Sequence, residues 1–401
     1  MSRAGRGVLI MAGGTGGHIF PGLAVADSLR AAGIDVRWLG ARGGMDSRKV
    51  PEHDIPLDLV DISGLRGKGL TRWLGMPFRL LRAVYQAFRV LGRNRPSCAI
   101  SFGGYAAGPG GLAARLRGVP LLVHEQNRIP GMTNRTLARF ANRVLQAFPG
   151  SWDEKLNPLT CGNPVRRDVV DLEPPETRLQ GRSGPVRILL TGGSQGALAL
   201  NRLVPEALGL LRETHEFEVH HQAGPRWVEE TREAYSRSGF SREGFKESKE
   251  KDFAAEAAPT AAPTEKKDIA AEAAPTAAPV VEVTDFIEDM AAAYAWADVV
   301  VCRAGALTVS EVAAAGVAAL FIPFPHAVDD HQTRNAEFLV ENDAALLLQE
   351  SQTDARTLAK ALSSLVGDRA RLVSMAVRGR AAAVPDSADR VAALCREYVT
   401  S

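Results

Sequence analysis

The chain has 401 residues, 45% of them hydrophobic, and its 48 Lys and Arg against 46 Asp and Glu give a net charge of +2. This near balance argues against a protein that binds nucleic acid through bulk charge. The hydrophobic content excludes a wholly disordered chain. At roughly 150 residues per domain, the length predicts two or three globular units.

The cysteines and the N-terminus indicate the compartment. Cys98, Cys161, Cys302 and Cys395 lie far apart and form no C-x-x-C motif, which argues against a disulfide framework or a zinc site and favours a reducing compartment. The basic N-terminus followed by Val8–Ala12 resembles a secretion signal, but the apolar stretch is too short and glycines follow it. No apolar run reaches the roughly 18 residues of a membrane span. We expect a cytoplasmic protein.

Short apolar runs alternate with helical stretches in the first half, the pattern of a parallel α/β sheet that is buried on both faces. The predicted helices include Pro21–Ala32, Gly75–Val90 and Met132–Phe140. The predicted strands of this half are Val8–Ala12, Asp35–Gly40, Pro56–Ile62, Cys98–Phe102, Pro120–His124 and Arg143–Ala147.

A Pro-rich polar stretch near residue 165 precedes a second α/β pattern. We expect an N-terminal domain over 1–165, a C-terminal domain over 166–385, and a last helix within 386–401 that can pack on either domain. An Ala/Pro-rich repeat predicts a flexible insertion at about 241–279. The predicted strands of the second half are Val186–Leu190, Glu218–Gln222, Val280–Thr284, Asp298–Cys302, Ala318–Pro323 and Ala344–Leu348.

Three glycine clusters each follow a predicted strand, at 13–17, at 103–111 and at 192–196. A strand, a glycine loop and a helix start together let backbone N–H groups approach an anion closely. Because the clusters are shared between two α/β domains, which bind ligands at the carboxyl ends of their strands, they predict two phosphorylated ligands. Simple tight turns are the alternative.

Two familiar phosphate motifs are excluded. No Lys follows any of these glycines, so there is no Walker loop, and from Gly14 the third position of a dinucleotide fingerprint is Ile19. The second predicted strand ends at Gly40 without the acid that would bind a ribose. An NAD-dependent oxidoreductase is therefore disfavoured.

Polar side chains cluster at other strand ends, where hydroxyl recognition or proton transfer takes place. His124-Glu-Gln-Asn127 follows one apolar strand, and an amide- and imidazole-rich loop from Phe324 to Asn335 follows another. Glu311 comes one turn into a predicted helix, where its carboxylate could accept two hydrogen bonds from a ribose diol. Charge stabilisation of the first helical turn is the alternative role.

Together these motifs resemble the MurG family, the bacterial N-acetylglucosaminyl transferases that convert lipid I to lipid II in peptidoglycan synthesis. The resemblance spans nearly the whole chain in matching order, and the insertion at about 241–279 is the departure from it. The matching segments are Met11–Gly22, Ile62–Gly69, Gly103–Tyr105, His124–Asn127, Gly162–Arg166, Gly192–Gly196, Asp285–Met290, Arg303–Glu311 and Asp329–Thr333.

The resemblance implies the two-domain glycosyltransferase B fold and an inverting transfer from UDP-N-acetylglucosamine (UDP-GlcNAc) to the MurNAc 4-hydroxyl of a polyprenyl-pyrophosphate-linked muramyl-pentapeptide. His18 is our first choice for the base that takes the hydroxyl proton, since the ordinary imidazole pKa is about 6.5, and Glu125 is the second. His18 could instead only position the acceptor.

The resemblance also implies binding roles. The backbone of Ile287 would pair with uracil, Glu311 would bind the ribose, Ser194 would contact the diphosphate, and Gln332 with Asn127 would meet the GlcNAc hydroxyls. The implied donor-binding residues are Thr15, Gly16, Gly17, Asn127, Arg166, Ser194, Gln195, Ile287, Ala306, Leu307, Thr308, Glu311 and Gln332. The implied acceptor-pyrophosphate residues are Gly13, Gly14, Gly103, Gly104 and Tyr105.

No Asp-x-Asp motif is present to hold a metal at the diphosphate, and we expect neither a metal nor another cofactor. Helix dipoles and backbone N–H groups would then stabilise the leaving UDP. Arg166 is expected near the phosphates, with a hinge ion pair as its alternative role.

Between Ser63 and Arg95 the sequence has eight Lys and Arg interleaved with large apolar residues and no acid. Apolar residues beside cations are typical of a helix that lies on an anionic membrane surface. We expect peripheral, salt-sensitive association with the cytoplasmic face of the bacterial inner membrane. Some of these apolar residues must also pack on their own sheet.

Three alternatives remain open at this stage. Another UDP-sugar-dependent glycolipid glycosyltransferase or a UDP-GlcNAc epimerase would share the fold. A non-catalytic sugar-nucleotide sensor would keep its function after substitution of His18 and Glu125.

Overall fold

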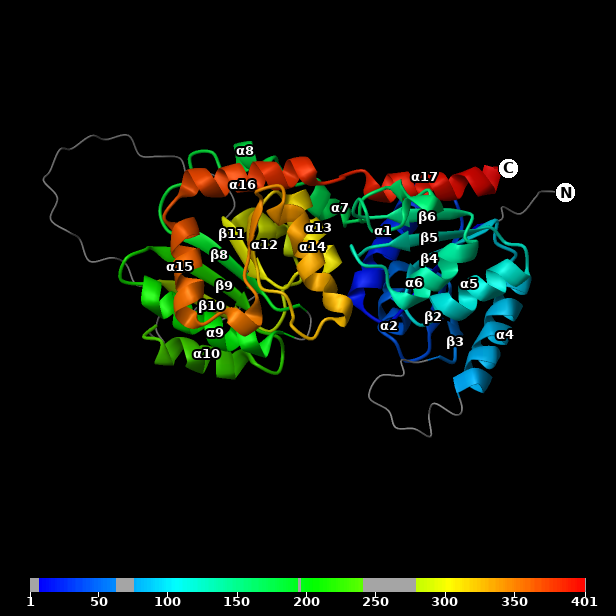
Figure 1. The fold of residues 1–401 in the computed structure, drawn as a ribbon, viewed down its shortest axis with the longest axis horizontal. Helices are drawn as coiled ribbons and strands as arrows, with labels where there is room; N and C mark the ends of the chain where they lie inside the picture. Colours follow the sequence, from blue (N-terminus) through cyan, green and yellow to red (C-terminus); the bar gives the residue numbers. More distant parts are fainter. Residues whose placement is uncertain (1–6, 63–75, 194–195, 241–278, 401) are drawn as a thin grey trace, which may run out of the picture. The chain divides into compact units, whose positions relative to one another are not determined.

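The computed structural model describes residues 7–62, 76–193, 196–240 and 279–400 (Figure 1). The chain divides into two compact units. The first comprises residues 1–167, 305–310 and 384–401, and the second comprises 168–304 and 311–383. Each is built on one parallel sheet, so the predicted α/β class is confirmed. The predicted insertion at 241–279 lies outside the described residues except for its last position.

The sheet of the first unit has the order β3-β2-β1-β4-β5-β6-β7, with all pairs parallel. Val8 and Ile10 of β1 enter one apolar core, while Leu9 and Met11 enter the core on the opposite face. The six predicted strands are confirmed within a few residues. The strands are β1 (Val8–Ala12), β2 (Val36–Ala41), β3 (Leu57–Val60), β4 (Cys98–Gly103), β5 (Leu121–Glu125), β6 (Arg143–Gln146) and β7 (Leu159–Thr160).

The strand order of this sheet reverses between β1 and β4, because β2 and β3 lie on one side of β1 while β4 to β7 lie on the other. The loops that follow β1 and β4 therefore meet at the carboxyl edge, where open α/β sheets bind ligands. The edge strand β7 has two exposed residues, so no apolar run in the sequence marks it.

Helices cover both faces of the first sheet (Figure 1). The last helix belongs to this unit: Asp389 accepts a hydrogen bond from Ser28 Oγ at 2.6 Å, and Ser387 Oγ donates to the Asn163 carbonyl at 2.9 Å. The helices are α1 (Gly16–Ala31), α2 (Asp46–Lys49), α4 (Met76–Asn94), α5 (Ala107–Leu116), α6 (Met132–Leu137) and α17 (Ser387–Thr400), with 3₁₀ turns at Pro51–His53, Ala138–Phe140 and Glu154–Leu156.

Helix α1 begins at Gly16, five residues before the predicted start at Pro21. Proline favours the first position of a helix, which is why the sequence pattern suggested Pro21. In the structure the first turn closes on the carbonyl of Thr15, which accepts the N–H groups of His18 and Ile19 at 3.1 and 3.3 Å. His18 therefore lies in the first turn of α1, near its partially positive end.

The sheet of the second unit has the order β10-β9-β8-β11-β12-β13, again entirely parallel. All six predicted strands are confirmed. The strands are β8 (Val186–Thr191), β9 (Phe217–Gln222), β10 (Val280–Thr284), β11 (Val299–Cys302), β12 (Ala318–Phe321) and β13 (Ala345–Leu347). The helices are α7 (Arg167–Val170), α8 (Pro175–Arg178), α9 (Leu198–Leu211), α10 (Val228–Arg237), α12 (Met290–Trp296), α13 (Ala306–Ala315), α14 (His331–Val340), α15 (Ala355–Val366) and α16 (Arg369–Ala382), with 3₁₀ turns at Val328–Asp330 and Glu350–Gln352.

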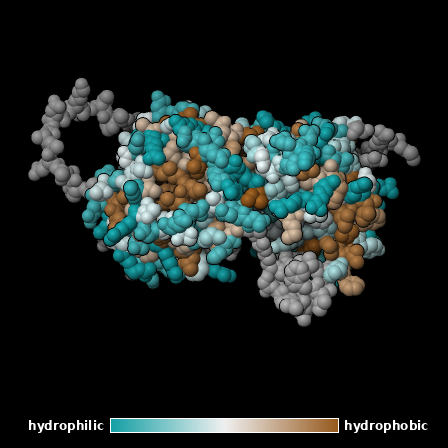
Figure 2. Space-filling model, viewed as in Figure 1, coloured by the Kyte–Doolittle hydropathy of each residue, from teal (hydrophilic) through white to brown (hydrophobic). Residues whose placement is uncertain are grey.

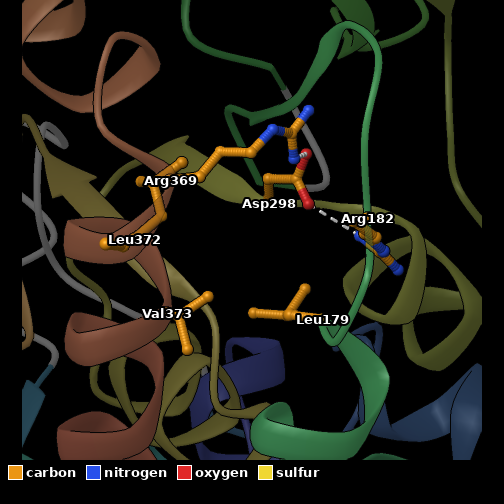
Figure 3. Close-up of a pocket in the computed structure, with 7 residues that line it drawn as sticks. Leu179, Arg182, Asp298, Arg369, Leu372 and Val373 are labelled. Carbon is orange, nitrogen blue, oxygen red and sulfur yellow. Dashed lines mark hydrogen bonds and ion pairs between the residues drawn. The ribbon is translucent and has the colours of Figure 1, made fainter.

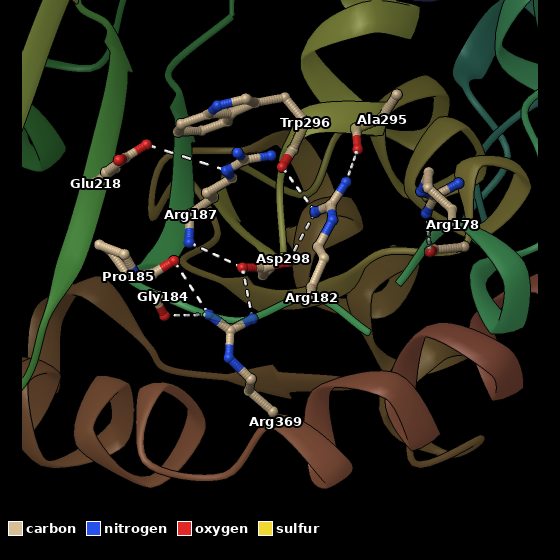
Figure 4. A network of polar contacts seen from close by, with 11 residues as sticks. Arg178, Arg182, Gly184, Pro185, Arg187, Glu218, Ala295, Trp296, Asp298 and Arg369 are labelled. Carbon is tan, nitrogen blue, oxygen red and sulfur yellow. Dashed lines mark hydrogen bonds and ion pairs between the residues drawn. The ribbon is translucent and has the colours of Figure 1, made fainter. Parts of the chain in front are cut away.

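An arginine network closes the amino edge of this second sheet (Figure 4). Asp298, 3% exposed, accepts hydrogen bonds from Arg182 at 2.8 Å, from Arg369 at 3.3 Å and from the backbone N–H of Arg187 at 3.0 Å. Arg182 also donates to the carbonyls that end α12. A cavity of about 120 Å³ lies beside Arg182 and Asp298 and is lined by Leu179 and residues of α16 (Figure 3). The network is structural, because its cations already have backbone or carboxylate partners.

Candidate functional site

The glycine loops after β1 and β4 touch at the carboxyl edge of the first sheet. Gly14, Gly103 and Gly104 have φ values of +99°, +94° and +83°, a region that favours glycine. A side chain on Gly104 would lie 1.9 Å from the Gly13 carbonyl oxygen, and one on Gly14 would meet the Tyr105 ring at 3.8 Å. The structure thus brings together the five residues predicted to take the acceptor's pyrophosphate.

His18 faces the same place from the first turn of α1. A Cβ on Gly103 would lie 3.3 Å from His18 Nε2, and Thr15 Oγ1 lies 3.4 Å from His18 Nδ1. Gly16 and Gly17 complete this turn, which has no acidic residue. An imidazole and the positive end of a 16-residue helix therefore lie beside the two glycine loops.

Glu125, the second predicted base, is 2% exposed and engages both its oxygens in structural hydrogen bonds. Oε1 accepts from the N–H and the side-chain amide of Asn127 at 3.0 and 3.1 Å. Oε2 accepts from the N–H of Gly131 and from Asn134 Nδ2, both at 3.1 Å. These contacts show Glu125 ordering the loop that carries Asn127.

His124 is fully buried at the end of β5, with Nε2 2.9 Å from the Gly162 carbonyl and Nδ1 3.1 Å from Gln126 Nε2. Burial lowers the pKa of His124 to about 4, and the Gly162 carbonyl offsets only part of this effect. His124 therefore acts as a neutral part of the core beneath the loop.

This burial predicts how stability depends on pH. Since the folded pKa of His124 lies below the unfolded value of about 6.5, its contribution is present above pH ~6.5 and is lost as pH falls toward the folded value. Between pH 7 and 5 the wild type should lose about 2 kcal/mol more than His124→Gln, as measured by urea unfolding at both pH values. Equal losses in the two proteins would contradict a buried neutral His124.

The glycine loop after β8 is held by a residue that the sequence reasoning missed. Gln222 ends β9, is 4% exposed, and donates from Nε2 to the carbonyls of Gly193 and Asp285, both at 3.1 Å. It thereby ties the glycine loop to the segment that leads to Ile287. Its place at the carboxyl end of a buried strand is the signal that could have identified it. Ser194 and Gln195, predicted to bind the donor, lie outside the described residues.

Glu311 lies in the second turn of α13 and is 6% exposed. Its Oε2 accepts a hydrogen bond from the Tyr294 hydroxyl at 3.3 Å. The predicted Ala306, Leu307 and Thr308 form the first turn of the same helix. The helix start and a buried carboxylate therefore follow β11 directly.

Gln332 is oriented by the backbone of two neighbouring loops. Its Oε1 accepts the N–H of Phe324 at 2.9 Å and the N–H of Ala304 at 3.3 Å, which leaves its two amide N–H donors for other partners. Arg303 fixes the same loops, since it donates to the carbonyls of Ile322 and Pro323. The other predicted residues lie on both units, with Asn127 and Arg166 in the first and Ile287 in the second.

Comparisons with known proteins identify the family of the two α/β domains. Residues 8–146 match the glycosyltransferase family 28 N-terminal domain, and residues 187–391 match its C-terminal domain. The chain is 51% identical over 387 residues to the UDP-N-acetylglucosamine–N-acetylmuramyl-(pentapeptide) pyrophosphoryl-undecaprenol N-acetylglucosamine transferase of Xanthomonas euvesicatoria, covering 96% of this chain and 80% of that protein. The transferase of the same name from Marinobacter nauticus is 45% identical over 98% of this chain and 97% of its own length.

Solved structures indicate the same family. The crystal structure of Acinetobacter baumannii MurG matches with a TM-score of 0.76 at 37% identity and covers 98% of this chain and 99% of that one. A putative UDP-N-acetylglucosamine 2-epimerase from Listeria monocytogenes, at 14% identity and a TM-score of 0.58, shares the fold alone. The matching domains and the identity over nearly the whole chain establish that this protein belongs to glycosyltransferase family 28 and, within it, to the MurG family of N-acetylglucosaminyl transferases.

Proposed function

We propose that this chain transfers GlcNAc from UDP-GlcNAc to the 4-hydroxyl of MurNAc in undecaprenyl-pyrophosphoryl-MurNAc-pentapeptide, which turns lipid I into lipid II for peptidoglycan synthesis. The observation that carries the proposal is the identity of about half of all positions with transferases of that name along 96% of the chain. The glycine loops at the carboxyl edges of both sheets support it, since each substrate carries a diphosphate.

The N-terminal domain predicted over residues 1–165 is proposed to bind the acceptor. The loops of Gly13, Gly14, Gly103 and Gly104, with Tyr105, take the acceptor's pyrophosphate on backbone N–H groups. His18 removes the proton of the 4-hydroxyl as the oxygen attacks the anomeric carbon of GlcNAc. The bond from that carbon to the UDP oxygen breaks, which inverts the anomeric configuration. Glu125 is the second candidate for this base, and it also holds the loop of Asn127.

The C-terminal domain predicted over residues 166–385 is proposed to bind the donor. The backbone of Ile287 pairs with uracil, and Glu311 accepts hydrogen bonds from the ribose diol. The loop of Ser194 and Gln195 contacts the diphosphate, together with the α13 start at Ala306, Leu307 and Thr308. Gln332 and Asn127 bind the sugar hydroxyls, Arg166 faces the phosphates, and Thr15 to Gly17 complete the donor set.

The direct test is transfer of labelled GlcNAc from UDP-GlcNAc to a lipid I analogue by the full chain. We expect a labelled disaccharide lipid with a β-linkage and one UDP released per transfer. Conversion of UDP-GlcNAc to its 2-epimer without the acceptor and without net release of UDP would instead indicate an epimerase. Transfer to a glycolipid that lacks the muramyl-pentapeptide would indicate a glycolipid glycosyltransferase with a different acceptor.

The first unit also supports membrane association. An apolar patch over α4 and α5 (Figure 2) contains Phe78 and Leu81, 77% and 66% exposed, and Tyr85, Leu112 and Leu116, also exposed. Patches of this kind usually mark an interaction surface. No described helix is long and apolar enough to cross a bilayer, so we propose peripheral binding to the cytoplasmic face of the inner membrane.

The cations of this surface divide into two groups. Arg82 pairs with Asp61 at 2.9 Å, and Arg93 pairs with Asp58, two acids that precede the acid-free segment. Arg79 and Arg89 on the same helix have no ion pair with another described residue. These two are the better candidates for anionic lipid. Arg66, Lys68, Arg72 and Trp73 of the predicted surface lie outside the described residues.

The paired substitution Phe78→Glu with Leu81→Glu should weaken binding to vesicles of phosphatidylethanolamine and phosphatidylglycerol at least tenfold. Two large apolar side chains that enter the interface contribute about 1.5–3 kcal/mol each when buried. Co-sedimentation with vesicles measures the effect. Leu210→Glu, at a position of the second unit that is 53% exposed, is the matched control and should bind as the wild type does. Equal weakening by both changes would contradict the patch.

Lipid II supplies wall growth. Depletion of this protein is therefore proposed to alter cell shape and stop division.

A further inference from the structure

Asp46 is a buried carboxyl directly beneath the first glycine loop, and none of the motifs includes it. It is the first residue of α2 and is 0% exposed. Aspartates are almost never fully buried unless they are paired, yet no Lys, Arg or His in the described part of the chain forms an ion pair with Asp46. Its partners are backbone N–H groups instead.

These partners lie at the ends of two neighbouring strands. Oδ2 accepts the N–H of Ala41, the last residue of β2, at 2.5 Å. The same carboxyl adjoins the loop after β1, since a Cβ on Gly13 would lie 3.6 Å from both its oxygens. Desolvation raises the pKa of Asp46 above its ordinary value, and the N–H groups of Ala41 and Gly14 offset part of the shift. Oδ1 is buried with no partner in hydrogen-bond geometry.

The surrounding backbone leaves room for this carboxyl only because it is made of glycine. A Cβ on Gly40 would lie 2.1 Å from Asp46 Oδ2, and a Cβ on Gly44 would lie 2.1 Å from Oδ1. Gly13 also adjoins the group, since its Cβ would meet both oxygens at 3.6 Å. The backbone at Gly40 and Gly44 and the loop at Gly13 therefore surround one carboxyl.

The position of this loop determines its fit to the neighbouring one. Gly13 lies so close to Gly104 that any Cβ there would overlap the Gly13 carbonyl, and Gly14 adjoins the Tyr105 ring. A small displacement of Gly13 and Gly14 would therefore disturb both loops together. A group that packs against Gly13 therefore contacts the backbone on which the fit of both loops depends.

We propose that Asp46 is a positioning residue for the acceptor, whose carboxyl holds Gly13 and Gly14 so that the two glycine loops present their N–H groups to the acceptor's pyrophosphate. This inference rests on the proposed function of those loops. Asp46 touches no substrate and acts through the backbone. Its loss should therefore affect acceptor binding selectively.

The test compares steady-state kinetics of Asp46→Ala, Asp46→Asn and the wild type in the labelled transfer assay. Asp46→Ala leaves the N–H of Ala41 without its acceptor and removes the carboxyl that adjoins Gly13. We expect the KM for the lipid I analogue to rise about tenfold with the KM for UDP-GlcNAc unchanged. Asp46→Asn keeps an acceptor oxygen and the packing beside Gly13, and it should restore the acceptor KM to within about threefold of the wild type. If the alanine variant does not fold, Asp46→Ser, which is too short to keep both contacts, replaces it.

Asp298→Asn is the matched control, a buried aspartate of the second unit that also accepts a backbone N–H. It should lower the melting temperature without changing either KM. Equal rises of both KM values in Asp46→Ala, an unchanged acceptor KM, or no rescue by Asp46→Asn would each overturn the inference. Gly14→Ala distinguishes failure of the Asp46 inference from failure of the proposed loop function, because it strains the loop directly. If it raises the acceptor KM and Asp46→Ala does not, only the inference fails; if neither variant does, the proposed loop function fails too.

Discussion

Replacing His18 by alanine is expected to lower kcat about a thousandfold while the KM for UDP-GlcNAc stays within a few-fold of the wild type. General base catalysis contributes typically about 10²–10⁴ in rate, and a removed base leaves the binding of the donor intact. The imidazole lies in the first turn of α1, with Nε2 beside Gly103. This contact with the glycine loop after β4 is the reason for proposing the imidazole as the base.

The measurement is steady-state transfer of labelled GlcNAc across pH 5–9. In the wild type we expect an acid limb in kcat/KM that reports one essential base, and in His18→Ala the residual activity should lack this limb. His53→Ala, at a histidine of the same unit that ends a 3₁₀ turn before β3, serves as control and should retain wild-type kcat. A loss smaller than tenfold in His18→Ala, with a raised acceptor KM, would assign His18 to positioning of the acceptor.

The strands of both sheets could be predicted from the sequence because parallel strands that are buried on both faces appear as continuous apolar runs. Val299–Cys302, for example, is fully buried in the middle of its sheet. The two-residue strand β7 is exposed and has no such pattern. The start of α1 was wrong because the closure of its first turn on Thr15 depends on backbone hydrogen bonds that no periodicity records.

The candidate site could be predicted in its location more than in its chemistry. Glycine loops at strand ends identified the edges of both sheets correctly, because the positive φ values at Gly14, Gly103 and Gly104 require the residue that the sequence shows. The hydrogen bonds that Glu125 accepts could not be predicted, since their donors belong to the loop after β5 and to α6, two to nine residues further along the chain. Gln222 was missed because its partners, Gly193 and Asp285, are 29 and 63 residues away in loops that follow other strands.

The second large effect is expected at Glu311, where substitution by alanine should weaken UDP binding about a hundredfold. Hydrogen bonds to charged groups contribute about 1.5–3 kcal/mol each, and a tenfold change in Kd corresponds to about 1.4 kcal/mol. Because the Glu311 carboxylate is only 6% exposed, water competes little for its hydrogen bonds. Two ribose hydroxyls on one buried carboxylate would therefore account for a loss of this size.

Titration calorimetry with UDP and with 2′-deoxy-UDP tests this assignment directly. The wild type should bind UDP at least tenfold more tightly than the deoxy compound, and Glu311→Ala should bind the two alike, since the partner of the 2′-hydroxyl is gone. Tyr294→Phe, which removes the hydroxyl that donates to Glu311 Oε2 at 3.3 Å, should weaken UDP binding only a few-fold. Ser310→Ala, whose hydroxyl is bonded to the carbonyl of Ala306 within the same helix, controls for damage to α13. If Glu311→Ala still distinguishes UDP from its deoxy form, the ribose is bound elsewhere, and Glu311 serves only to hold Tyr294 against the helix.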